Sequence, residues 1–443
     1  MKNYIEPNLA SGFRDYLPSD AAAREWMVET IKTVFKRFGF APLETPGVER
    51  EEILTGGDPN FKKQIFKLNL SGQDEKTALR FDLTVPLARV IAAYQNELPK
   101  PWKRYQVGSA WRGERAQAGR FREFLQIDAD IVGAPGTMAD AEIVSLIYET
   151  LSALGFKKFV IKVNNRKILN ALFGYADFPK GKTETVLRIL DKLDKNKWKD
   201  VESELVKETR LDKNAVGSLK KFVELKGDSK KILKEASALF EDSKTAEEGI
   251  SELGELANNV KALGVPDKNW MVDLSVARGL GYYTGPVFEA VLTDYPELGS
   301  VFAGGRYDDL ISRFSSASIP VTGASLGVDR LFVALKKFGL LPDFKSPAQV
   351  LLLNFDRESE EVCEKLASDL RRDGVSTEIY LGQEKNLKGQ LSYAVKQSYP
   401  VVLIIGEEER KKRIVQIKNM RERVQEAVPR EDVLSYIKGL LNP

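Results

Sequence analysis

Four arginines lie within the eleven residues 112–122, and acidic and aromatic residues alternate with them. A guanidinium group presents a planar fork of donors that suits phosphate and carboxylate oxygens, and an aromatic ring nearby offers a surface on which a base can stack. A solvated run of charges would explain the arginines but not the apolar residues among them, Phe121, Phe124 and Ile127. A hairpin with Arg112 on its first strand and Phe124 on its second explains both and predicts a nucleotide site.

Two glycine-rich segments could also bring backbone close to a ligand. In residues 277–289 (ARGLGYYTGPVFE) the tyrosine hydroxyls could orient a polar substrate, and a structural loop with packed tyrosines is an equally open alternative. Residues 303–310 (AGGRYDDL) are followed by 323–331 (GASLGVDRL), which predicts a strand of small residues that runs into a helix. Because helix N-termini favour anions, Arg330 on that helix is a candidate phosphate ligand. The alternative is a structural helix start with an exposed arginine.

The chain of 443 residues contains no histidine and a single cysteine, Cys363. A histidine-based catalytic triad, imidazole metal ligands and the usual near-neutral acid–base group are therefore excluded. An intramolecular disulfide and a cysteine zinc site are excluded too, and we expect Cys363 to be a small buried residue on a helix. The chemistry must depend on arginine, lysine, carboxylates, hydroxyls, backbone dipoles or the substrate.

The composition is that of an ordinary globular protein, with 43% hydrophobic and 30% charged residues, and the length allows two or three domains. The net charge of +3, from 67 basic and 64 acidic residues, predicts no general attraction to nucleic acid. Any RNA contact must come from local patches. No apolar stretch has the length of a membrane span, and the first residues lack the core of a signal peptide. We therefore expect a cytoplasmic protein.

The elements that must position these residues begin with an amphipathic helix, which Ser19 or Asp20 is expected to cap and Gly39 to end. Its apolar residues recur at helical spacing: Met27, Ile31, Val34, Phe35 and Phe38. Extended segments are expected at 40–44, 65–70, 103–111, 124–132, 159–163, 270–274 and 287–293, and helices at 86–95 and 140–155.

Residues 167–263 are rich in lysine, glutamate, leucine and aspartate and show helical periodicity, which predicts an inserted helical module. A proline-containing linker is expected near 344–348. Beyond it, strands are expected at 350–354, 376–380 and 401–405, and helices at 359–373 and 387–397. This alternation predicts a small α/β domain with parallel strands.

Taken together, these segments resemble the class II aminoacyl-tRNA synthetases, and within that class the histidyl-tRNA synthetases. The first motif of the class, a helix followed by a strand that ends in proline, matches residues 20–46. The second is the arginine hairpin, and the third ends at Arg330. The histidyl family is indicated by residues 278–285 (RGLGYYTG), by Asp82-Leu83-Thr84, and by Gln126 with Asp130.

The resemblance covers nearly the whole chain and implies its architecture. Residues 1–165 and 265–343 would form an α+β catalytic domain with an antiparallel sheet, and residues 166–264 would be a helical insertion in it. Residues 348–443 would form a C-terminal α/β anticodon-binding domain. The resemblance also implies a homodimer, because the first motif builds the dimer interface in this family.

The function that the resemblance implies is ATP-dependent ligation of L-histidine to its tRNA, tRNA(His), through a histidyl-adenylate intermediate. The carboxylate of histidine attacks the α-phosphorus of ATP, so the protein needs no nucleophile of its own. Catalysis is then mainly alignment and charge stabilisation, and Arg112 and Arg278 are the expected catalytic residues. Mg²⁺ is expected with ATP, without assigned ligands.

The resemblance also assigns binding residues. Asp130 and Tyr283 would recognise the imidazole nitrogens, Phe124 would stack on adenine, and Arg330 would meet the γ-phosphate, while polar partners matched to the ring reject other amino acids. The residues expected to bind the amino acid are Asp82, Leu83, Thr84, Arg112, Gln126, Asp130, Arg278, Tyr282 and Tyr283. Those expected to bind ATP are Arg112, Glu114, Arg120, Phe124 and Arg330. Those expected at the acceptor end of the tRNA are Arg115 and Gln117.

Two positions depart from the family pattern: Gly281 stands where many members have an acidic residue, and Leu125 replaces a usual histidine. The lysines of the helical insertion could contact acceptor-stem phosphates or could equally be a solvated helical face. These lysines are Lys220, Lys221, Lys230, Lys231 and Lys234. Residues 411–413 (KKR) are candidates for anticodon contacts.

Two other functions compete with this one. The first is a synthetase-like regulatory subunit of histidine biosynthesis, but such proteins lose catalytic arginines and the anticodon domain, whereas Arg112, Arg278, Arg330 and a C-terminal domain are present here. The second is a class II synthetase for another amino acid, such as threonine or proline, against which the Tyr282-Tyr283 segment argues.

Overall fold

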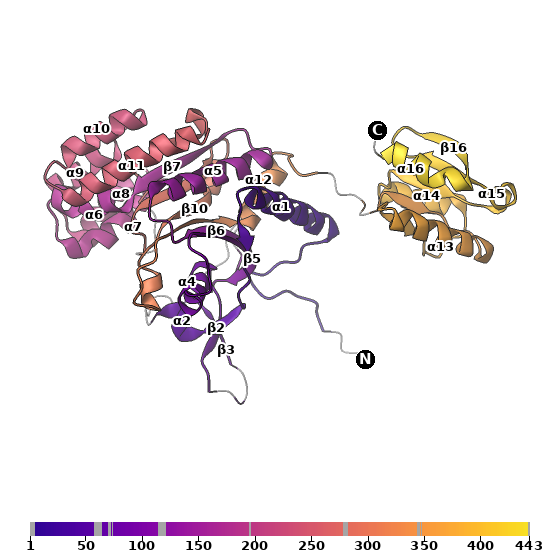
Figure 1. Cartoon of the computed structure of the whole chain (residues 1–443), viewed down its shortest axis with the longest axis horizontal. Helices are drawn as coiled ribbons and strands as arrows, with labels where there is room; N and C mark the ends of the chain where they lie inside the picture. Colours follow the sequence, from indigo (N-terminus) through magenta and orange to yellow (C-terminus); the bar gives the residue numbers. More distant parts are fainter. Residues whose placement is uncertain are drawn as a thin grey trace. The chain divides into compact units, whose positions relative to one another are not determined.

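The computed structural model describes residues 5–56, 64–69, 72, 74–113, 121–194, 196–277, 282–342, 346 and 348–441 (Figure 1). The chain divides into two compact units. The first is formed by the residues up to 16 and by 24–341, and the second by the residues from 342 onwards together with 17–23. The described residues that are predicted to bind histidine or ATP all belong to the first unit.

A mainly antiparallel sheet forms the centre of the first unit. Among the described residues it has eight strands, in the order β1-β5-β6-β11-β10-β9-β7-β8. The inner strands pair antiparallel, whereas the edge strands β1 and β8 pair parallel with their neighbours. The antiparallel sheet expected from the sequence is therefore confirmed. The strands are β1 (Ala41–Pro42), β5 (Trp102–Trp111), β6 (Glu123–Val132), β7 (Phe159–Asn165), β8 (Trp270–Val272), β9 (Pro286–Leu292), β10 (Ser300–Arg306) and β11 (Val321–Gly327).

Strand β6 separates an apolar from a polar environment. Its middle alternates between the two kinds of residue in the order Gln126, Ile127, Asp128, Ala129, Asp130, Ile131, and successive side chains of a strand point to opposite faces. Helices α5 (Thr137–Ala153) and α12 (Val328–Lys337) pack against β6. Across the sheet, Ile131 pairs with Thr322 of β11, and Thr322 pairs with Arg306 of β10, so the three side chains share one face. Arg306 forms an ion pair with Asp140 of α5 on that face. The apolar residues therefore face these helices, and Gln126, Asp128 and Asp130 point to the other side of the sheet.

Helix α1 (Pro18–Arg37) buries the predicted apolar residues Met27, Ile31, Val34 and Phe35. The cap expected at Ser19 or Asp20 is wrong, because the helix already begins at Pro18, whose fixed φ suits the first helical position. The chain continues through α2 (Glu51–Thr55) and α4 (Thr84–Ala93). In the described part of this region β2 (Val48–Arg50), β4 (Thr77–Leu79) and β3 (Phe66–Leu68) pair antiparallel in a separate small sheet.

The chain between β7 and β8 is helical, as predicted for residues 167–263, and its helices lie together in Figure 1. Completely buried leucines and valines of several helices, such as Leu205, Leu219 and Leu253, hold them together. The helices are α6 (Arg166–Tyr175), α7 (Thr183–Leu190), α8 (Trp198–Thr209), α9 (Lys213–Val223), α10 (Ser229–Leu239) and α11 (Lys244–Ala262). No described helix of the chain is both long and apolar enough to cross a membrane.

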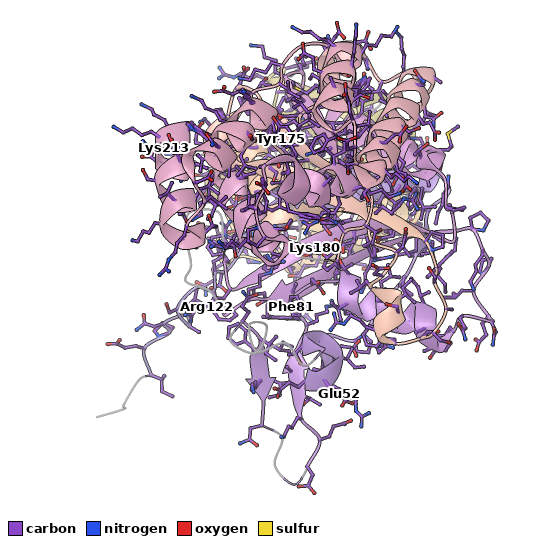
Figure 2. The ribbon with its side chains drawn as sticks, turned by 90° about the vertical axis from the view of Figure 1, so that its left-hand side faces the viewer. Glu52, Phe81, Arg122, Tyr175, Lys180 and Lys213 are labelled. Carbon is purple, nitrogen blue, oxygen red and sulfur yellow. The ribbon has the colours of Figure 1, made fainter. Side chains whose placement is uncertain are left out.

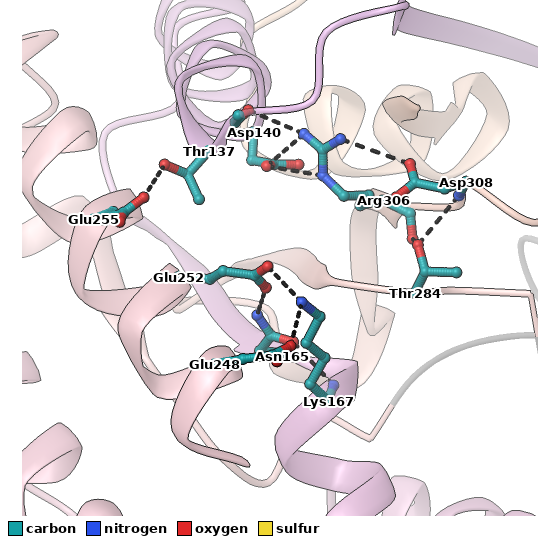
Figure 3. A network of polar contacts seen from close by, with 11 residues as sticks. Thr137, Asp140, Asn165, Lys167, Glu248, Glu252, Glu255, Thr284, Arg306 and Asp308 are labelled. Carbon is teal, nitrogen blue, oxygen red and sulfur yellow. Dashed lines mark hydrogen bonds and ion pairs between the residues drawn. The ribbon is translucent and has the colours of Figure 1, made fainter. Parts of the chain in front are cut away.

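Polar contacts attach α11 to the sheet and its neighbours (Figure 3). The Asn165 amide at the end of β7 donates to a Glu252 carboxylate oxygen at 2.7 Å, and the Lys167 ammonium donates to the other oxygen at 2.8 Å. At the start of α5, the Thr137 hydroxyl donates to Glu255 at 3.2 Å. Lys167 also donates to Glu248 at 3.2 Å, so these contacts tie α11 to the end of β7, to α6 and to α5 over about two turns.

The second unit contains a mixed sheet of the order β13-β12-β14-β15-β16 in its described part. The predicted parallel pairing holds for β13, β12 and β14, but β15 and β16 form an antiparallel hairpin that was not predicted. Most side chains of β16 are exposed, so this strand carries no clear apolar pattern. Cys363 is completely buried on α13, as expected. The elements are β12 (Val350–Leu352), α13 (Arg357–Arg372), β13 (Thr377–Ile379), α14 (Leu387–Lys396), β14 (Val401–Ile404), α15 (Glu407–Lys412), β15 (Ile414–Asn419), β16 (Val424–Pro429) and α16 (Val433–Leu441).

Candidate active site

A cavity of about 680 Å³ lies on the polar side of β6. Its walls come from the start of α4, the end of β5, strands β6, β10 and β11, the residues before β9, and helix α7. The described residues that line it include six of those predicted to bind the amino acid: Asp82, Thr84, Arg112, Gln126, Tyr282 and Tyr283. The remaining lining residues are Glu184, Thr185, Leu187, Arg188, Asp191, Ala277, Ala303, Gly304 and Ser325.

The start of α4 presents two side chains to the cavity: Asp82, two residues before the helix, and Thr84, its first residue. One carboxylate oxygen of Asp82 accepts from the backbone N–H of Val85 at 3.2 Å, which holds the side chain at the start of the helix. Asp82 is 4% exposed, and burial raises its pKa to about 6, with the nearby Asp128 as a further contribution. Leu83, between them, is completely buried and is not among the described residues that line the cavity.

Gln126, Asp128 and Ser325 form a hydrogen-bonded group on the two neighbouring strands β6 and β11. The Gln126 Nε2 donates to Asp128 at 2.8 Å and lies 3.3 Å from the Ser325 hydroxyl. The Thr84 hydroxyl lies 3.5 Å from the second Asp128 oxygen. Sequence reasoning missed Asp128, although the period-two alternation of β6 places it on the same face as the two predicted residues Gln126 and Asp130.

Asp130 is 3% exposed and is not among the described residues that line the cavity. One of its oxygens lies 2.7 Å from the guanidinium of the completely buried Arg104, directly opposite on β5, and the other accepts from the Tyr307 hydroxyl. Burial raises the pKa of Asp130 to about 6 although Arg104 and Tyr307 lower it. On β11 the position opposite is Gly323, where a Cβ would overlap the Asp130 carboxylate. The carboxylate is therefore fixed in place by both neighbouring strands.

The predicted hairpin is confirmed by the pairing of β5 with β6, in which Ala110 lies opposite Phe124. Arg112 follows the last residue of β5 rather than lying on the strand. Its backbone N–H donates to the Arg122 carbonyl at 2.8 Å, and its Nε donates to the Phe81 carbonyl at 3.1 Å. Figure 2 labels both partners, below the helices that carry Tyr175 and Lys180 in that view. The guanidinium carbon lies 4.9 Å from the centre of the Phe124 ring, so a cation and an aromatic face meet as predicted.

Arg330 is the third residue of α12, the helix that follows β11 as predicted. Its guanidinium donates to the Ser300 carbonyl at 2.8 Å. The five other predicted site residues, Glu114, Arg115, Gln117, Arg120 and Arg278, lie outside the described residues.

Helix α7 brings residues of the helical region to the cavity, which the sequence did not indicate. Arg188 on this helix lines the cavity and forms ion pairs with Glu208 and, at 3.8 Å, with Glu204 of α8. Glu184, one turn earlier, lines the cavity too and pairs with the buried Arg166. In the described chain, no group of three or more carboxylates or cysteines is arranged to hold a metal ion.

An antiparallel sheet, an arginine beside an aromatic ring on its hairpin, and a strand that runs into an arginine-bearing helix together define a class II aminoacyl-tRNA synthetase. The sequence model of the family "Histidyl-tRNA synthetase" matches residues 12–331, and that of the "Anticodon binding domain" matches residues 349–440. With these matches, the chain belongs to the histidyl-tRNA synthetase family.

Individual relatives agree with the family. A histidine–tRNA ligase of Clostridium tetani is 38% identical over 443 residues, which is 99% of each chain. One of Wolinella succinogenes is 41% identical over 421 residues, 94% of each chain. The crystal structure of histidyl-tRNA synthetase from Nostoc sp. PCC 7120 superposes with a TM-score of 0.87 at 33% identity, over 98% of this chain and 100% of that one.

The chain is therefore an enzyme that joins histidine to tRNA(His) with the energy of ATP, and the activated intermediate is the adenylate, as throughout class II. A regulatory subunit without aminoacylation and a synthetase for another amino acid are rejected.

Proposed function

We propose that the cavity on the polar side of β6 binds histidine with its amino group towards Asp82, Thr84 and Gln126 and its carboxylate towards Arg112. The supporting observation is that these side chains line a single cavity, in which three carry acceptor oxygens and one carries a guanidinium. A zwitterionic amino acid has its ammonium and its carboxylate on the same carbon. A group of acceptor oxygens and a guanidinium in the lining of one cavity fit that arrangement.

ATP is proposed to bind beside Arg112, with its adenine stacked on Phe124 and its phosphates reached by Arg112, Arg120 and Arg330. The cation–aromatic contact at the hairpin supports this, because it puts a phosphate ligand and a stacking surface next to each other. Glu114 is proposed to lie near the adenine amino group. Mg²⁺ would enter as part of the substrate MgATP, held chiefly by phosphate oxygens.

The reaction then needs no nucleophile from the protein. The histidine carboxylate is already ionised, and its oxygen attacks the α-phosphorus while pyrophosphate leaves. Arg112 would hold the attacking carboxylate in line and, with Arg278, offset the charge that develops on the α-phosphate oxygens. In the second step a ribose hydroxyl of tRNA attacks the carbonyl carbon of the adenylate and AMP leaves. Arg115 and Gln117 are proposed to hold the acceptor end of the tRNA for this step.

The imidazole ring is proposed to be recognised by Asp130 and Tyr283, with Tyr282 beside them. The buried Leu83 is proposed to support the residues that line this part of the cavity. The buried Asp130 is a carboxylate held by Arg104 and Tyr307, which would keep its position constant for a ring N–H. A site with fixed polar partners discriminates strongly against side chains that leave those partners unmatched.

The division of labour along the chain is proposed to follow the expected boundaries: catalysis by 1–165 and 265–343, support of the acceptor stem by 166–264, and anticodon binding by 348–443. The approach of α7 to the cavity supports a role of the helical region near the reacting end of the tRNA. We further propose that the enzyme acts in the cytoplasm as a homodimer, which sedimentation would test.

Amino-acid-dependent exchange of pyrophosphate into ATP tests the site. Histidine should support exchange, and Arg278→Ala should abolish it while the variant still folds. Arg372→Ala, which removes an exposed arginine of the second unit, is the control and should leave exchange unchanged. If Arg278→Ala retains exchange, the catalytic assignment is wrong. Asp130→Ala should weaken histidine binding much more than ATP binding, and equal effects on both would reject ring recognition.

A further inference from the structure

Asp128 is a buried carboxylate with no role in the proposed site, and it holds two of the residues that have one. It lies on β6 between Gln126 and Asp130, on the same face of the sheet, and is 2% exposed. One of its oxygens accepts from Gln126 at 2.8 Å, and the other is 3.5 Å from the Thr84 hydroxyl. Gln126 and Thr84 line the cavity, whereas Asp128 is not among the described residues that line it.

These contacts determine which atoms Gln126 can offer to a ligand. An ionised carboxylate only accepts hydrogen bonds, so the amide of Gln126 must turn its NH₂ group towards Asp128. The same NH₂ group also reaches the Ser325 hydroxyl at 3.3 Å. The carbonyl oxygen of Gln126 is the part of the amide that these contacts leave for the cavity.

The same reasoning applies to Thr84. A hydroxyl has one hydrogen to donate and two lone pairs to accept with. When Thr84 gives its hydrogen to Asp128, its oxygen meets a ligand as an acceptor. Asp82, two residues before α4, uses one oxygen for the N–H of Val85. Its carboxylate borders the cavity, so its other oxygen is the acceptor that we assign to the ligand.

We propose that Asp128 is a positioning residue for the α-ammonium group of histidine: it orients Gln126 and Thr84 so that both present acceptor atoms beside the Asp82 carboxylate. Three acceptors then match the three N–H donors of an ammonium group. The negative charge of Asp128 adds to the attraction for a cation without touching it. This inference rests on the proposed amino-group site of Asp82, Thr84 and Gln126.

Charge on the residues around Asp128 agrees with this role. Burial raises the pKa of Asp128, and Arg104 lowers it, as do its hydrogen bonds with Ser325, Gln126 and Thr84. The negative charge of Asp128 raises the pKa of Asp82, because it makes ionisation of the nearby Asp82 carboxyl less favourable. An ammonium group bound between them would relieve that repulsion.

The test compares three ligands on Asp128→Asn and the wild type by calorimetry. Histidine and histidinol both carry the ammonium group, whereas imidazolepropionate has the same ring and carboxylate without it. A hydrogen bond to a charged group contributes enough that its loss should raise the Kd of histidine and histidinol by about ten- to hundred-fold. The Kd of imidazolepropionate should change by less than about two-fold on the same reasoning. At saturating histidine the kcat of exchange should be largely retained.

Asp140→Asn is the matched control, because Asp140 is equally buried but lies on the other face of the sheet, paired with Arg306. It should leave all three Kd values unchanged. A uniform loss of affinity for all three ligands in Asp128→Asn, or no loss for any, would overturn the proposal. Asp128→Ser gives the same comparison with a smaller side chain, and failure of both variants to fold would show that Asp128 serves stability instead.

Asp82→Asn separates this inference from the site on which it rests. If Asp82→Asn weakens histidine binding and Asp128→Asn does not, the amino-group site stands and the role of Asp128 is rejected. If Asp82→Asn has no effect on histidine binding, the proposed site itself is wrong.

Discussion

Replacement of Arg104 by methionine should destabilise the first unit strongly, and more at alkaline than at acidic pH. Arg104 is completely buried on β5, and its guanidinium lies 2.7 Å from Asp130. Its Nε and Nη1 have no hydrogen-bond partner among the described residues. In that part of the chain, the ion pair with Asp130 is therefore the main interaction that offsets the cost of burying the guanidinium charge. Methionine fills a similar volume but leaves the carboxylates of Asp130 and Asp128 buried without that cation.

The expected loss can be worked from the ion pair. Removing one partner of a buried pair costs about 3–5 kcal/mol, because the other charge stays buried and uncompensated. The same loss can be expressed as a pKa: each unit by which the Asp130 pKa rises above its present value of about 6 corresponds to about 1.4 kcal/mol. A carboxyl group with a raised pKa gives up stability as the pH rises through that pKa. At pH 8, about two units above the present pKa, the pH-dependent part of the loss should therefore reach about 3 kcal/mol. At pH 5, where Asp130 is protonated, the loss should be less than about half as large.

Urea unfolding followed by tryptophan fluorescence measures this loss in the relevant unit. The five tryptophans all belong to the first unit, at positions 26, 102, 111, 198 and 270. Adding Asp130→Asn to Arg104→Met should recover most of the lost stability at pH 8, since no buried charge then remains at that position. Equal losses at pH 5 and pH 8, or no recovery in the double variant, would refute the reasoning.

Three other predictions concern the cavity. Phe124→Ala should raise the KM for ATP about ten-fold and leave the Kd of histidine unchanged, because stacking of a base on an aromatic ring contributes about 1–3 kcal/mol. Pyrophosphate exchange at varied ATP concentration measures this KM, and an unchanged KM would count against the adenine site. Gly323→Ala should lower the free energy of unfolding by about 1–3 kcal/mol and weaken histidine binding, because the new methyl group displaces Asp130. Gly327→Ala on the same strand is the control: no atom lies within 4 Å of its Cβ position, so it should change neither. The ratio of the Kd of imidazolepropionate to that of histidine should fall as the pH drops through about 6, where Asp82 gains a proton and loses its attraction for the ammonium group. The ring pKa of each free ligand is measured first and each Kd is corrected for it, because the ammonium group lowers the ring pKa of histidine. A corrected ratio that stays constant from pH 5 to pH 8 would contradict the role of Asp82.

The strands and the hairpin of the site could be predicted because the residue patterns that indicate them lie within a few neighbouring positions of the sequence. The alternation of β6 and the pairing of arginines with aromatic residues at 112–124 can be read without knowing the fold. The ion pair of Arg104 with Asp130 could not be read in this way, because it depends on the register of β5 against β6. Asp128 was within reach of the same alternation, but its hydrogen bonds to Thr84 come from a helix 44 positions earlier.

The contribution of α7 could not be predicted for another reason. Glu184 and Arg188 lie in a stretch whose composition is that of any solvated amphipathic helix, and nothing in it indicates that one side faces a cavity. The C-terminal hairpin of β15 and β16 was missed because β16 exposes most of its side chains. A strand whose side chains are mostly exposed has no alternation of apolar and polar residues, so the sequence pattern does not indicate it.

The parallel pairing of β7 with β8 bears on how a protein of this architecture could have grown. Two parallel neighbours need a crossover of a dozen or more residues, and one helix is enough to make it. Helix α11 packs against β7 and α5 and leads directly to β8, so it alone could close that connection. The helices α6–α10 are then not needed for the crossover itself, and one of them, α7, borders the cavity on the polar side of β6.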